Sequence, residues 1–197
     1  IAFRRHAQWI ASQYKRAVKN GWHLDFKNYY NINNKGIWKN TDLTYMNKLK
    51  IIKKYSKSKP LILKFEELKK DPFNYLNKIS NYTDSKYLKT EISFKTVHKS
   101  YSEKQLIFLK KFCKIFKKTP PTYYDYQEIT LDKTISNTNR IKHWLFYRPW
   151  WLLFHLVMYT SLLIPKSLIV KNSLINKNDL AEIKNKFKED WKKVFEY

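Results

Sequence analysis

The opening 21 residues combine a short apolar start with a helical pattern, and this combination constrains the fold more than any other part of the sequence. Residues 1–5 are typical of the end of a strand. Apolar side chains then recur at intervals of three and four from Ala7 to Val18, which places them on one face of a helix that Gly21 ends. A strand followed at once by an amphipathic helix indicates an α/β domain.

Two further signals support this interpretation. Leu61 to Phe65 form a short apolar run after Pro60, which favours a buried strand. Asp71 followed by proline predicts a helix start, because the carboxylate caps the first turn and proline fits the first helical position. Phe73, Leu76 and Ile79 are expected on the inner face of that helix.

Other helices are predicted from capping residues and apolar spacing. Ser102 and Gln105 form a capping-box pattern that opens a helix through Cys113 to Phe116. The remaining expectations are a helix from a Thr41 or Asp42 cap to Tyr55, an irregular stretch over 122–140, and a last helix over 178–195 that buries Leu180, Ile183, Phe187, Trp191 and Val194.

The expected fold class is therefore α/β, as part of a P-loop-like three-layer α/β/α domain with a parallel sheet, plus a helical carboxy-terminal extension. Residues 1–125 form the α/β part. Residues 126–197 form the extension, which packs on the same domain. The chain does not begin with methionine, and we expect it to be the carboxy-terminal part of a longer polypeptide.

The segment 144–164 in the extension is strongly apolar, and no charged residue lies between Trp150 and Ile164. A membrane-spanning helix needs about 20 apolar residues, and Arg148 and Pro149 are expected to stop the helix from extending backwards. A buried or lid helix is the favoured interpretation. A helix in a membrane interface, flanked by Arg148 and Lys166, is the second, and a true span is the third.

The charge and the scarce residue types limit the classes of function. The formal net charge is +24, which suits polyanionic partners, although lysine accounts for most of it and fills solvated positions in a sequence of this composition. A single cysteine, Cys113, excludes an internal disulfide and a multi-cysteine metal site, and we expect it in the core. The histidines show no ligand spacing, so no metal is predicted.

Arginine is rare, and three of the five arginines lie within the first 16 residues. Arg4 stands at the end of the expected strand, where a helix amino terminus and a guanidinium together favour a phosphate group. Ser12, eight residues later, lies on the polar stripe of the helix and could donate its hydroxyl to the same anion. Tyr14 lies on the apolar face and is expected to be a core residue.

The stretch Arg4-Arg5-His6-Ala7-Gln8-Trp9-Ile10-Ala11-Ser12-Gln13-Tyr14 resembles the 3'-phosphate-binding motif of sulfotransferases that use 3'-phosphoadenosine 5'-phosphosulfate. Arg4, Ser12 and Tyr14 match that motif, whereas His6 stands where proline is common. "LILKFEELKKDP", "HKSYSEKQLIFLKKF" and the closing "LAEIKNKFKEDWKKVFEY" are similar to later parts of the family, in the same order. The resemblance covers about 1–118 and 178–197.

The resemblance implies that Arg4 and Ser12 bind the 3'-phosphate of the co-substrate, with Arg5 as the alternative to Arg4 if the register differs by one. Glu66 and Glu67 are expected to be structural or surface residues. The chain has two glycines and no glycine-rich phosphate loop, so the phosphosulfate loop and the catalytic residues are expected upstream, and no catalytic residue is assigned here. The implied acceptor is a hydroxyl or amine, for example of a glycan or a lipid.

Two other functions remain open at this point. One is a P-loop-type phosphoryl-transfer protein. The other is a non-catalytic basic module that binds a membrane surface, through 144–164, or nucleic acid. Nucleic acid is disfavoured, because most aromatic residues fall on apolar helix faces rather than on a lysine-rich surface. The expected compartment is cytoplasmic, with or without membrane association.

Overall fold

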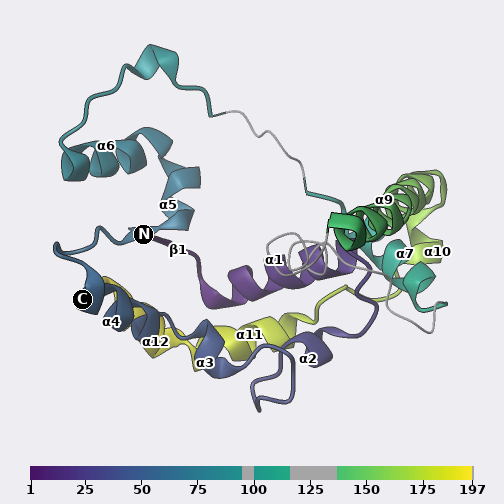
Figure 1. The fold of residues 1–197 in the computed structure, drawn as a ribbon. Coiled ribbons are helices and arrows are strands. Elements are labelled where there is room, and N and C mark those ends of the chain that lie inside the picture. Colours follow the sequence, from purple (N-terminus) through teal and green to yellow (C-terminus); the bar gives the residue numbers. More distant parts are fainter. Residues whose placement is uncertain (95–99, 116–136, 197) are drawn as a thin grey trace.

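The computed structural model describes residues 1–94, 100–115 and 137–196, and these residues are predominantly helical (Figure 1). The first part contains β1 (Ala2–Phe3), α1 (His6–Lys19), α2 (Phe26–Tyr29), α3 (Asn40–Leu43), α4 (Tyr45–Tyr55), β2 (Leu63–Lys64), α5 (Phe65–Lys70), α6 (Pro72–Thr83) and η1 (Lys89–Glu91). The second part contains α7 (Glu103–Cys113), α9 (Asn137–Thr160), η2 (Ser161–Leu163), α10 (Lys166–Ile169), α11 (Lys177–Lys186) and α12 (Lys188–Glu196).

The sheet consists of β1 and β2, which pair in parallel with Ala2 opposite Leu63 and Phe3 opposite Lys64. The amide of Leu63 donates to the carbonyl of Ile1 over 2.8 Å. A two-stranded pair is marginal by itself. Here it is anchored because Phe3 packs in a small core cluster with Tyr45, Leu49 and Val194.

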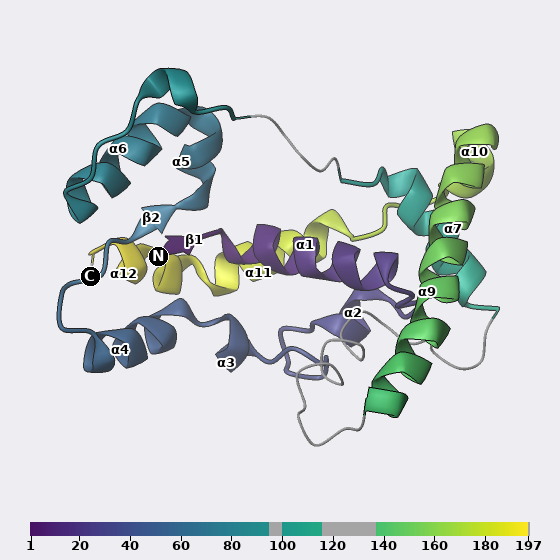
Figure 2. The same ribbon diagram turned by 45° about the horizontal axis from the view of Figure 1, so that its top comes forward.

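Helix α1 runs through the centre of the molecule, from the part that contains β1, α4 and α12 to the part that contains α7 and α9 (Figure 2). Its buried face packs against α7 and α11, and Ile10, Tyr14 and Val18 are fully buried there. The terminal helix α12 packs against α4 beside β1. Segments from both ends of the chain therefore surround the residues that follow β1.

Several local predictions are confirmed. Asp71 accepts a hydrogen bond from the amide of Asn74 over 3.0 Å and caps α6, which begins at Pro72. Ser102 and Gln105 form the capping box at the start of α7. The apolar face predicted for the first helix is the buried face of α1.

Other predictions need correction. The α/β class holds only in a coarse sense, because the described residues contain one two-stranded parallel pair and no larger sheet. The second strand is shorter than expected: Phe65 already begins α5, whose first turn carries Glu66 and Glu67. The helix of 41–55 is divided at Thr44, and the last helix is divided at Phe187.

The predictions for the inner face of α6 and for residues 122–140 also change. In α6, Tyr75 is the buried residue, and Phe73, Leu76 and Ile79 are only partly buried. The irregular stretch expected over 122–140 falls mostly outside the described residues, and its last residues, 137–140, begin α9. Phe116, the expected end of the helix that begins after Ser102, also lies outside the described residues.

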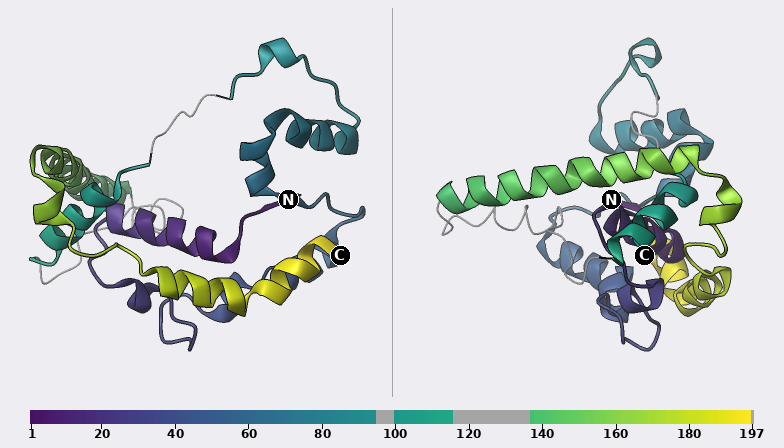
Figure 3. Two further views of the ribbon diagram at one scale, coloured as in Figure 1. Left: turned by 180° about the vertical axis from the view of Figure 1, so that it is seen from behind. Right: turned by 90° about the vertical axis from the view of Figure 1, so that its right-hand side faces the viewer.

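Helix α9 continues through Pro149 rather than beginning after it. The prediction that Arg148 and Pro149 stop the helix is therefore wrong, and Figure 3 shows the first turns of α9 extending beyond the neighbouring helices. None of the helices in the described ranges is long and apolar enough to cross a membrane. The interpretation of 144–164 as a span is thereby not supported.

Candidate functional site

Arg4 lies between the end of β1 and the start of α1, where the chain turns from strand to helix. Arg5 occupies the N-cap of α1, and its amide donates to Glu66 Oε1 over 3.0 Å. The first turn of α1 has no acidic residue and no side-chain cap. The Glu66 carboxylate therefore already offsets part of the positive charge at the amino terminus of α1, and the first-turn amides of the helix are the remaining donors for an anion.

The side chain of Arg4 is half-buried, and its guanidinium carbon lies 5.5 Å from the centre of the Phe65 ring. Its Nε atom is buried and has no hydrogen-bond partner among the described residues. A buried donor without an acceptor is costly. An anion beside Arg4 would satisfy this donor.

The backbone of Arg4 is held by Tyr45, whose hydroxyl donates to the Arg4 carbonyl over 2.7 Å. Burial raises the pKa of Tyr45 far above 10.0, and the nearby Asp190 and Glu66 carboxylates raise it further, whereas Arg4 lowers it. The Tyr45 hydroxyl therefore stays protonated and serves as a hydrogen-bond donor.

Ser12 lies on α1, half-buried, on the same stripe as Gln8 and Lys15. It is six residues beyond the start of α1 at His6, a rise of about 9 Å along the helix axis. The structure brings Arg4, Arg5 and Glu66 together at the strand ends. Within the described residues it shows no hydrogen bond between Ser12 and Arg4.

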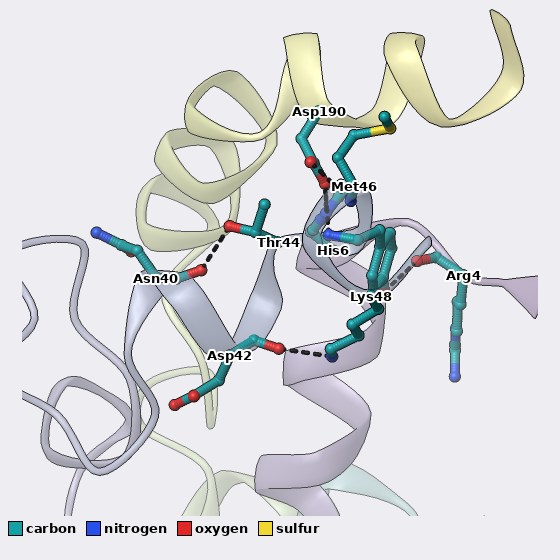
Figure 4. A network of polar contacts seen from close by, with 9 residues as sticks. Arg4, His6, Asn40, Asp42, Thr44, Met46, Lys48 and Asp190 are labelled. Carbon is teal, nitrogen blue, oxygen red and sulfur yellow. Dashed lines mark hydrogen bonds and ion pairs between the residues drawn. The ribbon is translucent and has the colours of Figure 1, made fainter. Parts of the chain in front are cut away.

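A second polar cluster lies on the other side of this junction, and the sequence did not predict it. His6, only 3% exposed, shares a 2.9 Å hydrogen bond between its Nε2 atom and Asp190 Oδ2. Asp190 also accepts from the backbone amides of Tyr45 over 2.8 Å and Met46 over 3.2 Å. Figure 4 shows the Arg4 side chain pointing away from this cluster.

The imidazole of His6 is enclosed by aromatic rings. It stacks on Tyr45 with centroids 4.1 Å apart and on Phe187 at 4.6 Å, and the edge of Trp191 completes the enclosure. Because the ring is shielded and its Nε2 atom is paired, His6 is a structural residue that joins α1 to α12 and α4. No periodicity or motif in the sequence marked this pairing.

Two residues singled out in the sequence are core residues. Tyr14 is fully buried, as expected, and its hydroxyl donates to the carbonyl of Leu24 over 2.9 Å. Cys113 is also fully buried, and burial raises the pKa of its thiol to about 12. Neither side chain is available to a ligand.

A surface cavity of about 550 Å³ lies at the far end of α1, between α2, α7 and the segment after α10. It is lined in part by Lys110, Lys111, Lys114 and Asp25. Lys110 pairs with Asp25 over 2.7 Å, and that hydrogen bond holds the pKa of Asp25 below 3.8 although burial opposes it. None of the residues that line this cavity belongs to the junction of β1 and α1 where Arg4 lies.

No cluster of three histidine, cysteine, aspartate or glutamate side chains suited to a metal ion occurs in the described part of the chain. Comparison with known protein families, with curated proteins and with solved structures finds no match for this chain.

Proposed function

We propose that the chain belongs to a sulfotransferase that uses 3'-phosphoadenosine 5'-phosphosulfate, and that Arg4 binds the 3'-phosphate of this co-substrate. The observation that carries the proposal is the buried, unpartnered Nε of Arg4 among the described residues, beside the amino terminus of α1, where the side chain of the N-cap residue makes no capping hydrogen bond. A dianionic phosphate would accept from the guanidinium and from the helix amides together.

The parallel pairing of β1 and β2 supports the finer fold proposal, a P-loop-like three-layer domain. In such sheets, ligands bind at the carboxyl ends of the strands, where the following helices begin. Helix α1 begins three residues after β1 ends, and α5 begins directly after β2. Arg4 and Glu66 are both located at this edge.

In the proposed reaction an acceptor hydroxyl or amine attacks the sulfur atom in line. The S–O bond to the 5'-phosphate breaks, adenosine 3',5'-bisphosphate leaves, and the acceptor proton passes to a base. Arg4 contributes by fixing the nucleotide, which orients the sulfuryl group toward the acceptor. Ser12 is proposed to donate its hydroxyl to the same phosphate.

The test is a calorimetric titration of the chain with adenosine 3',5'-bisphosphate and with adenosine 5'-monophosphate, which lacks the 3'-phosphate. We expect the bisphosphate to bind more tightly. Arg4→Ala should raise its dissociation constant about tenfold or more, the equivalent of one charge-assisted hydrogen bond. Ser12→Ala should have a smaller effect in the same direction.

Arg16→Ala is the matched control, because Arg16 is an exposed arginine on the same helix. Equal loss of affinity in Arg4→Ala and Arg16→Ala would show that only the overall charge matters. Preference for adenosine 5'-diphosphate over the 3'-phosphorylated nucleotide would favour a phosphoryl-transfer protein. Competition by plain DNA, with a steep dependence on salt, would favour a basic binding module.

A further inference from the structure

Helix α9 carries a stripe of exposed apolar side chains along one side, with Arg148 at its middle. The stripe consists of large side chains at least 57% exposed: Ile141, Leu145, Leu152, Leu156 and Tyr159. Their spacing of four, seven, four and three residues keeps them on one side of the helix. From the first to the last, the stripe is about 27 Å long.

The opposite face of α9 is buried. Phe154, Val157 and Met158 belong to the main core cluster, and α9 packs against α7. Folding of the chain therefore already uses one side of this helix. The outer stripe, called the α9 stripe below, contributes nothing to the core.

Basic and aromatic residues accompany the stripe. Arg148 lies between Leu145 and Leu152 on the same side, and its guanidinium carbon is 5.0 Å from the Trp144 ring centre and 5.9 Å from that of Trp151. Both tryptophans are more than one-third exposed. An arginine held among tryptophans can bury its stem and present its charge at the level of a phosphate.

The segment of the chain that carries the stripe has basic residues and no acidic ones. No aspartate or glutamate occurs between Asp132 and Asp179. Lys166 and Lys171, just beyond α9, are both exposed. An apolar helix face with tryptophan, arginine and flanking lysine, and without acidic groups, complements an anionic lipid surface.

We propose that α9 lies flat in the interface of an anionic phospholipid bilayer, with the α9 stripe in the acyl boundary and Arg148, Lys166 and Lys171 at the headgroup phosphates. A second copy of the chain fits less well, because two such faces would bring their cations together without acids to pair with. Nucleic acid fits less well, because four of the five residues of the stripe are aliphatic and offer no ring on which a base could stack. This proposal does not depend on the sulfotransferase function.

The experiment measures binding of the whole chain to vesicles of phosphatidylcholine, with and without about 30% phosphatidylserine, by flotation at about 0.15 M salt. We expect binding that increases with phosphatidylserine. Leu152→Gln combined with Leu156→Gln should lower the partition coefficient on the order of tenfold or more, because both leucines lose their burial in the lipid.

The matched control combines Ile51→Gln with Leu88→Gln. These side chains are 60% and 62% exposed, compared with 60% and 64% for Leu156 and Leu152, and they lie far from α9 in the chain. The control should bind vesicles like the unsubstituted chain. Circular dichroism of every variant checks that it is folded.

Quenching of tryptophan fluorescence by brominated lipid gives a second measurement on the unsubstituted chain, and strong quenching is expected. Equal vesicle binding by the two double variants would show that charge alone attracts the chain, and would overturn the proposal. Absence of binding, or of quenching, would overturn it as well. So would a concentration-dependent dimer that is lost in Leu152→Gln/Leu156→Gln while vesicles do not bind.

Discussion

His6 and Asp190 are 184 residues apart in the chain, and their side chains meet at 2.9 Å beside the turn from β1 to α1. The same carboxylate accepts the first amides of α4, at Tyr45 and Met46. One aspartate on α12 thus holds three elements together. Since Tyr45 also holds the carbonyl of Arg4, this cluster fixes the backbone of the candidate site.

The first prediction concerns the stability that Asp190 provides. Asp190→Ala removes the acceptor for His6 and for two backbone amides, all of which are in partly buried surroundings. We expect the free energy of unfolding to fall by about 3 kcal/mol, because charge-assisted hydrogen bonds are lost and buried donors are left unpaired. Urea denaturation followed by circular dichroism measures this change.

Glu189→Ala is the control for that measurement. Glu189 is the exposed neighbour of Asp190 on α12, so its removal should change the free energy of unfolding by no more than about 0.5 kcal/mol. If both substitutions had the same small effect, the assignment of Asp190 as the residue that holds α12 to α1 and α4 would be wrong.

The second prediction concerns the stability of the fold at low pH. Burial raises the pKa of Asp190, but the hydrogen bonds from His6 and from the Tyr45 and Met46 amides outweigh it, so that the pKa in the folded chain lies below 3.8. A carboxyl group with a lowered pKa stabilises the fold above its unfolded pKa, and this contribution is lost as the pH falls through the folded value.

Asp190→Asn removes this titration while keeping the shape of the side chain. The stability of the unsubstituted chain should therefore fall more steeply than that of Asp190→Asn between about pH 5 and pH 3. Urea midpoints measured across this range give the comparison. If the urea midpoints of the two proteins fell in parallel as the pH is lowered, these contacts would not lower the pKa of Asp190.

The third prediction concerns Cys113. Its thiol is fully buried, and burial raises its pKa to about 12, so the reactive thiolate is scarce at pH 8. We expect no reaction of the folded chain with an aromatic disulfide reagent at that pH, and one equivalent of thiol released after denaturation in guanidinium chloride. Rapid reaction without denaturant would place Cys113 at the surface.

The sequence was sufficient to predict elements whose causes are local. The face of α1, the Asp71 cap of α6 and the capping box at Ser102 all depend on residues within a few positions of one another. Propensity and spacing act at that range, and these predictions were confirmed. The core positions of Tyr14 and Cys113 followed from the same spacing.

The predictions that failed concern tertiary context. Pro149 removes one hydrogen bond of a helix and was expected to stop it. Helix α9 nevertheless continues through Pro149, and Phe154 and Met158, which follow the proline, pack in the main core. The His6–Asp190 pair joins opposite ends of the chain, so no local pattern could reveal it. Arg4 was placed correctly at the strand end. That Arg4 and Ser12 bind the same phosphate remains a prediction.

The last prediction connects this cluster to the candidate site. Tyr45→Phe removes the hydroxyl that donates to the Arg4 carbonyl over 2.7 Å. The free energy of unfolding should fall by about 1 kcal/mol. If Arg4 binds the 3'-phosphate, a less firmly held backbone should also raise the dissociation constant of adenosine 3',5'-bisphosphate about two- to fivefold.

Tyr30→Phe separates the two effects. Tyr30 is equally well buried, and its hydroxyl donates to Asn40 Oδ1 over 2.6 Å, away from β1. This variant should lose similar stability but bind the nucleotide like the unsubstituted chain, because its hydroxyl does not contact the site. An equal loss of affinity in both variants would mean that global stability, rather than the position of Arg4, controls binding, and the coupling between Tyr45 and the site would then be rejected.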